Sequence, residues 1–300
     1  MSKSFLNTFK TQNLKTSFFS YLSLVFLIFI PHNETVDDKY CIYENASKPN
    51  CSPNPNYSYS TEPEVLSSFS ELVVPVAFWG INHDDGSHDN PLTKEKIKES
   101  IDLLNHAFKA IKISFVFKDF NIINDSKIYW TDYYAFNKYI RSKGLSKDKT
   151  LNIYVPYRFT NYDNNLRGGK WSINQLSVNM LNYNTGILPH EVGHIFGLSH
   201  THSGYKARNC EHVTRDEDDP NYNANCSGDQ VTDTNAMPVL YNKFHLINDD
   251  CEYIGKLTNC KGTPYQLTKL DISNFMGYTQ HDCRSTFTTG QGIRVREFIK

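Results

Sequence analysis

This chain of 300 residues lacks several features that would each point to a particular class of protein. Its 31 Lys and Arg nearly balance its 32 Asp and Glu, so its charge gives no indication of a nucleic-acid partner. It has no internal repeat and, after residue 30, no apolar run long enough to span a membrane. Its seven cysteines include no C-x-x-C pair, which argues against zinc held by thiolates. With 39% hydrophobic residues, the chain can bury one good core.

The first 31 residues have the pattern of an export signal. Lys3, Lys10 and Lys15 precede every acidic residue, and the apolar run 18–30 follows them. That run is shorter than the ~18 apolar residues that a spanning helix needs. No small-x-small cleavage site is evident, so an uncleaved signal anchor is the alternative to a cleaved signal peptide. We therefore expect a secreted or extracytoplasmic protein, in the periplasm or at the cell surface, that touches the membrane only through this signal.

The remainder divides into two parts. Residues 32–70 are rich in Asn, Ser, Pro and Tyr without periodicity, which predicts a linker or short propeptide. Residues 71–300 are predicted to form one folded domain, in which the segment 203–274 is rich in loops and held by disulfides. Apolar patterns predict strands at 71–79, 113–117, 151–155 and, at a sheet edge, 177–180, and helices at 93–109, 134–141, 185–198 and 287–300.

Positions 190–200 carry the pattern H-E-x-x-H-x-x-G-x-x-H, which predicts a metal site. On a helix, His190 and His194 lie one turn apart on the same face, so both imidazoles can reach one metal ion. Gly197 lets the helix end in a sharp turn that brings His200 back as the third ligand. Three protein ligands leave the fourth position to water, as in catalytic zinc sites. Glu191 is then placed to remove a proton from that water.

A second motif, Asn274-Phe275-Met276-Gly277-Tyr278, lies downstream. A long histidine motif followed by a methionine turn is the metzincin pattern, in which Met276 would lie beneath the imidazoles as an apolar floor. Tyr278 could then donate a hydrogen bond to the substrate oxyanion or act as a weak extra ligand. The plainer interpretations are a core methionine and one half-buried tyrosine among 19.

Together these motifs resemble the pappalysin family of metzincins, in its compact secreted bacterial type. The similarity covers positions 71 to 300 and is tight from Leu188 onward; it includes the motifs at 190–201, 228–234 and 274–278, then Cys283, Phe287, Thr288 and Gln291. It implies an α+β zincin catalytic domain, with a mixed twisted sheet and the active-site helix above a loop-rich, disulfide-linked lower subdomain. The chain departs from the family's usual pattern at Gly277 and Asn235.

The resemblance implies a monomeric zinc endopeptidase that acts on a protein or peptide substrate. It also indicates a calcium site with Asp229 and Thr234 as ligands, whose carboxylate and hydroxyl oxygens suit that ion. A solvated acidic turn is the alternative. The disulfides it implies are Cys210–Cys260 and Cys251–Cys283.

Three cysteines have no counterpart in the resemblance. We expect Cys41 and Cys51 to form a small local disulfide, and Cys226 is left unassigned. Alternatively, a thiolate from Cys41 or Cys51 could take the water position on zinc and hold a zymogen inactive.

Two other functions fit a zinc site. The chain could be an inactive metal-binding module, although Glu191 and all three histidines are present. It could also be a zinc hydrolase of a non-peptide substrate, which only the family resemblance argues against. Digestion of a peptide library distinguishes these alternatives from an endopeptidase.

Overall fold

The computed structural model describes residues 51–160, 175–180, 183–203 and 210–299. The predicted export signal and Cys41 lie outside these residues. All described residues belong to one compact unit, Glu34–Lys300. Within the described part of the chain, no helix has both the length and the apolar character to cross a membrane.

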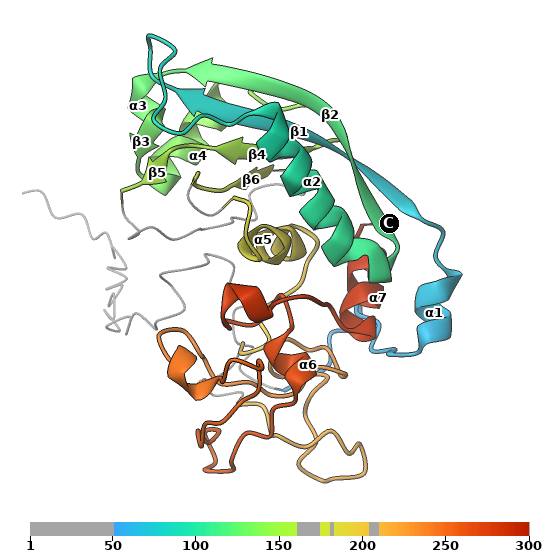
Figure 1. The fold of residues 1–300 in the computed structure, drawn as a ribbon. Coiled ribbons are helices and arrows are strands. Elements are labelled where there is room, and N and C mark those ends of the chain that lie inside the picture. Colours follow the sequence, from blue (N-terminus) through green and yellow to red (C-terminus); the bar gives the residue numbers. More distant parts are fainter. Residues whose placement is uncertain (1–50, 161–174, 181–182, 204–209, 300) are drawn as a thin grey trace, which may run out of the picture. The chain divides into compact units, whose positions relative to one another are not determined.

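Four parallel strands form the main sheet, in the order β2-β1-β4-β6 (Figure 1). β1 (Leu72–Asn82) and β4 (Leu151–Val155) agree with the predicted strands, whereas β2 (Ile113–Asn124) runs well past its predicted end at residue 117. β6 (Gln175–Ser177) lies at the sheet edge. Among the described strands of this sheet every pairing is parallel, so an antiparallel strand of the expected mixed sheet is not found among them.

Helices cover both faces of this sheet because strand side chains alternate between them. Val76 and Phe78 of β1 pack with α2 (Lys94–Phe108) and α5 (Ile187–Ile195), whereas Ile81 packs with α4 (Tyr133–Ser142) on the other face. α2 begins where Thr93 Oγ1 accepts a hydrogen bond from Lys96 N at 3.3 Å. α7 (Thr289–Phe298) closes the chain. The shorter elements are η2 (Lys109–Ile111), α3 (Ser126–Tyr129), β3 (Trp130–Thr131), β5 (Arg158–Phe159), η3 (Phe244–Leu246), α6 (Lys269–Ile272) and η4 (His281–Cys283).

The segment 203–274 is rich in loops in its described residues, as the sequence predicts. Its described residues between 210 and 274 form η3, α6 and isolated bridges around a small apolar cluster that includes Met237, Leu240 and Ile272. Cys210–Cys260 and Cys251–Cys283 are disulfides, with the pairing that the family resemblance implies. Cross-links compensate here for a core too small to hold the segment alone.

Residues 51–70 are packed on the domain and do not form a free linker, whereas the other expectation, a short propeptide, stays a prediction. They contain α1 (Pro63–Ser68), and Leu66 packs on the main core. Thr232 Oγ1 donates to Tyr59 O at 3.0 Å, and Arg294 Cζ lies 3.9 Å from the centre of the Tyr57 ring. The low periodicity of the segment gave no indication of these contacts, because single residues rather than an apolar stripe make them.

Cys51 pairs with Cys226, so the expected Cys41–Cys51 disulfide is wrong. Residues 51–60 lie along the loop that contains Cys226 and Thr232, which brings the two Cα atoms of the disulfide to 5.0 Å. The two cysteines are 175 residues apart in the sequence, so the short spacing between Cys41 and Cys51 wrongly favoured a local disulfide. In the disulfide, Cys51 has no thiolate to offer a zinc ion.

Removal of this long-range cross-link should destabilise the fold. We expect the Cys51→Ser/Cys226→Ser variant to lose about 2–5 kcal/mol of unfolding free energy, because the disulfide restricts a very long loop of the unfolded chain. Urea unfolding without reductant measures the loss. Cys41→Ser is the matched control and should leave stability unchanged; an equal loss in that variant would mean that Cys41 takes part in the cross-link.

Candidate metal centre

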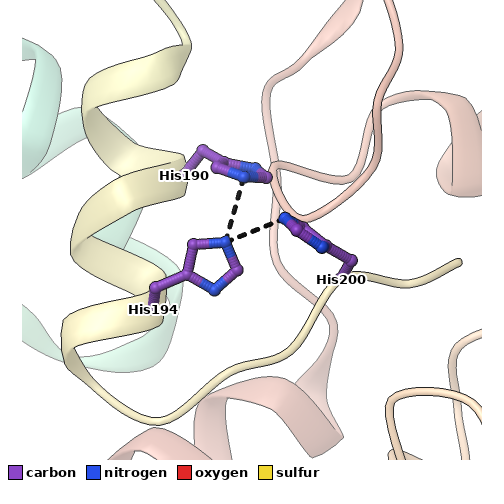
Figure 2. Close-up of side chains that lie close together, drawn as sticks. All are labelled: His190, His194 and His200. Carbon is purple, nitrogen blue, oxygen red and sulfur yellow. Dashed lines mark hydrogen bonds between the residues drawn. The ribbon is translucent and has the colours of Figure 1, made fainter. Parts of the chain in front are cut away.

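Three histidine rings converge at the end of α5. His190 and His194 project from one face of the helix, and His200 returns from the segment that follows it (Figure 2). His194 Nε2 lies 3.1 Å from His190 Nε2 and 3.0 Å from His200 Nε2. Tetrahedral zinc with Zn–N bonds of 2.0–2.1 Å would separate its nitrogen ligands by about 3.3 Å. Among the described residues, these three form the one group of His, Cys, Asp or Glu that could hold a metal ion.

Backbone carbonyls fix the orientation of two of these rings. His190 Nδ1 donates to Phe275 O at 2.6 Å, and His194 Nδ1 donates to Leu198 O at 2.8 Å. A carbonyl only accepts, so the ring proton is on Nδ1 and the lone pair is on Nε2. Lone pairs gathered in this way repel one another unless a cation lies between them. The donor set therefore fits a metal ion, with the ring orientation typical of zinc-bound histidine.

Burial keeps the three imidazoles neutral. It lowers the pKa of His194 to about 3, and it is the largest cause that holds the pKa of His190 and of His200 well below the usual value. All three side chains are buried. Neutral imidazole is the form that binds zinc, so the protein pays no deprotonation cost at neutral pH.

Gly197 ends α5 and aims the chain back toward the metal centre. Its φ is +89°, and a Cβ at this position would lie 2.8 Å from ring atoms of Phe298. Leu198 N then donates to Gly193 O at 3.0 Å. The turn delivers His200 to the other two histidines, so both backbone conformation and space require glycine here.

Gly197→Ala tests this requirement. We expect a loss of about 2–4 kcal/mol in unfolding free energy, together with weaker zinc binding, because a left-handed alanine and a clash with Phe298 are combined. Gly144→Ala is the matched control, since Gly144 has φ +62° and nothing within 4 Å of its added Cβ. Equal losses in the two variants would contradict a steric contribution from Phe298.

Met276 lies directly against α5. It is fully buried, and a Cβ on Gly193 would lie 2.5 Å from its Sδ atom. Met276 N donates to the Asn274 side chain at 2.9 Å, and Asn274 Nδ2 donates to Gln291 of α7 at 2.9 Å. The turn that carries Met276 is therefore tied to the last helix, and Gly193 provides the room for the Met276 side chain against α5.

Two aromatic rings pack against the histidine site. The Tyr278 ring centroid lies 4.6 Å from that of His200 and 5.9 Å from that of His190. His202 is buried, and its ring stacks on that of His200 with 4.6 Å between the ring centroids. Thr201 N donates to Met276 O at 3.1 Å, which joins the third histidine to the methionine turn.

Glu191 is buried on α5, next to His190. Arg284 is a second functional candidate near this helix, and the sequence analysis did not identify it. Arg284 donates from Nε and Nη2 to Thr279 O, at 3.1 and 2.7 Å. Burial lowers its pKa to about 10, against the opposing attraction of Tyr278 and Glu191. A lone arginine outside both motifs has no spacing that would place it near Glu191, so only the fold reveals it.

The expected calcium site receives no support. Asp229 Oδ1 accepts from Val231 N at 3.0 Å, and Thr234 Oγ1 donates to both Asp229 carboxylate oxygens, at 2.7 and 2.9 Å. Buried Glu211 forms an ion pair with Arg215, whose charge also acts on Asp229. Hydrogen bonds from Val231 N and Thr234 Oγ1 therefore already occupy the carboxylate of Asp229, the expected calcium ligand.

Comparisons with known proteins agree with this site. No protein-family model matches the chain. An extracellular metalloprotease of Neurospora crassa is 25% identical over 256 residues, which cover 78% of this chain and 77% of the relative. An extracellular metalloprotease of Sordaria macrospora is 26% identical over 256 residues, which cover 78% of this chain and 77% of the relative. The structure of mirolysin in complex with compound 9 matches with a TM-score of 0.51 and 17% identity, over 76% of this chain and 91% of mirolysin.

The likeness to mirolysin shows the fold, which is the α+β catalytic fold that the resemblance implies. Together, the fold, the three-histidine site and the named relatives support a metalloprotease. The three disulfides indicate an oxidising compartment, in agreement with the extracellular relatives.

Proposed function

We propose that the chain is a secreted, monomeric zinc endopeptidase of the metzincin type, similar to the compact pappalysins. The observation that carries this proposal is the convergence of three neutral imidazoles on one point, with Glu191 on the same helix. His190, His194 and His200 would hold the zinc. When bound, zinc would polarise a water molecule and the scissile carbonyl.

Glu191 would act as the general base and then as the general acid. Its carboxylate removes the proton from the attacking water and later delivers that proton to the leaving amine. The residue is buried beside His190, so bulk water does not compete for its proton. Tyr278, packed on the ring of His200, is the candidate donor to the carbonyl oxygen that gains charge.

The substrate would bind as an extended strand along β6, at the edge of the sheet. Backbone pairing of this kind accepts many sequences and leaves specificity to the side chains near the scissile bond.

Digestion of a mixed peptide library by the zinc-loaded protein tests the proposal. Mass spectrometry should detect internal cleavage that Glu191→Ala removes. An inactive binding module would leave every peptide intact, and so would a zinc hydrolase of a non-peptide substrate; activity on an ester or amide library would then separate those two.

A further inference from the structure

We infer that Arg284 selects substrates with an acidic side chain next to the scissile bond. The inference rests on the proposed function, because it assigns a substrate preference to that same site.

The side chain of Arg284 lies between the two elements that build the site. A Cβ built on Gly186, the residue before α5, would lie 3.5 Å from Arg284 Cβ and 3.7 Å from its Cδ. The stem of Arg284 therefore packs at the beginning of the helix that carries His190 and Glu191. The adjacent Cys251–Cys283 disulfide fixes the backbone at this point.

The guanidinium is held beside the methionine turn. Nε and Nη2 both donate to Thr279 O, and Thr279 directly follows Tyr278. The Tyr278 ring in turn lies 4.6 Å from the His200 ring. The carbonyl that anchors the guanidinium thus belongs to the residue next to Tyr278, and Nη1 takes no part in either hydrogen bond.

The charge of Arg284 acts on the groups of the site. After burial, interactions with Tyr278 and Glu191 have the largest influence on its pKa, which at about 10 leaves it cationic at neutral pH. A peptide cleaved at this centre would place side chains within reach of the same charge.

The acceptor of Arg284 is a backbone carbonyl, which does not neutralise its charge. Because guanidinium binds carboxylate through paired, charge-assisted hydrogen bonds, an Asp or Glu side chain is the chemical complement. Lys or Arg at the same substrate position would be repelled.

Paired peptides test the inference. Two peptides differ only by Asp or Asn on one side of a single scissile bond, and a second pair carries the change on the other side. In one pair, we expect the wild-type full chain to cleave the Asp peptide with kcat/KM about tenfold higher than the Asn peptide. The ratio should fall as salt rises from about 0.05 to 0.5 M, because ions screen the attraction.

Variants assign the preference to one residue. Arg284→Gln should bring the Asp/Asn ratio near one, Arg284→Glu should reverse it, and Arg284→Lys should keep it above one. Lys256→Gln removes an exposed cation from the same loop-rich segment and should leave the ratio unchanged. If Arg284→Glu does not fold, the salt dependence of the wild-type ratio still decides.

Three results would overturn the inference while leaving the endopeptidase intact. These are equal cleavage of Asp and Asn peptides by wild type, an equal loss on both peptides in Arg284→Gln, and a pH profile shifted alike for both, as a purely positioning role would produce. Failure of wild type to cleave any peptide of either pair or of the mixed library would instead contradict the proposed function.

Discussion

Glu191→Ala should lower kcat by about 10³-fold or more while the protein keeps its zinc, because general acid–base catalysis supplies an effect of this size. Glu191 is buried beside His190 but does not belong to the three-histidine group. Its removal therefore deletes the proton carrier without deleting a ligand. Peptide hydrolysis and the zinc content of the same sample provide the two measurements.

Two further variants sharpen this test. Glu191→Gln keeps the shape of the side chain and should be as inactive as the alanine variant, since an amide cannot take the proton. Glu71→Ala removes an exposed carboxylate and should leave kcat and zinc unchanged. Near-full activity in Glu191→Gln would remove the proposed mechanism.

His194→Ala should lose both the metal and the activity. His194 Nε2 is the central nitrogen of the group, at 3.1 and 3.0 Å from the other two, and its Nδ1 is anchored on Leu198 O. With two ligands left, zinc affinity should fall by several orders of magnitude, and peptidase activity should fall with it. Isothermal titration of the metal-free protein with zinc measures the loss.

The control for this variant is another histidine. His245 is exposed in η3, and His245→Ala should retain one zinc per chain and full activity. Unchanged zinc binding by His194→Ala would contradict the assignment of the ligands.

The main sheet and α2 could be predicted from the sequence, because the hydrophobic patterns of these segments are strong. The continuous apolar run of β1 predicts a strand buried on both faces, and the helical spacing of Ile97, Ile101 and Leu104 predicts the buried face of α2. The metal site could be predicted for a similar reason, since the spacing of His190 and His194 alone places two rings on one face of a helix.

Other features depend on contacts between distant residues and leave no local pattern. Cys51 meets Cys226 across 175 residues, and residues 51–70 owe their order to single contacts such as Tyr57 with Arg294. The calcium expectation finds no support for a related reason: the sequence shows the carboxylate of Asp229 but not the Thr234 hydroxyl and the Val231 amide that donate hydrogen bonds to it. Arg284 likewise belongs to no sequence motif, and only its contacts with Thr279 and Gly186 in the folded chain place it at the site.

The zinc edge of the X-ray absorption spectrum tests the central claim most directly. The purified full-length chain should contain one zinc per molecule, with three imidazole nitrogens at about 2.0–2.1 Å as the protein ligands from His190, His194 and His200. His194→Ala should abolish that signal. Absence of bound zinc in the wild type, or two or more sulfur neighbours at about 2.3 Å, would contradict the three-histidine site.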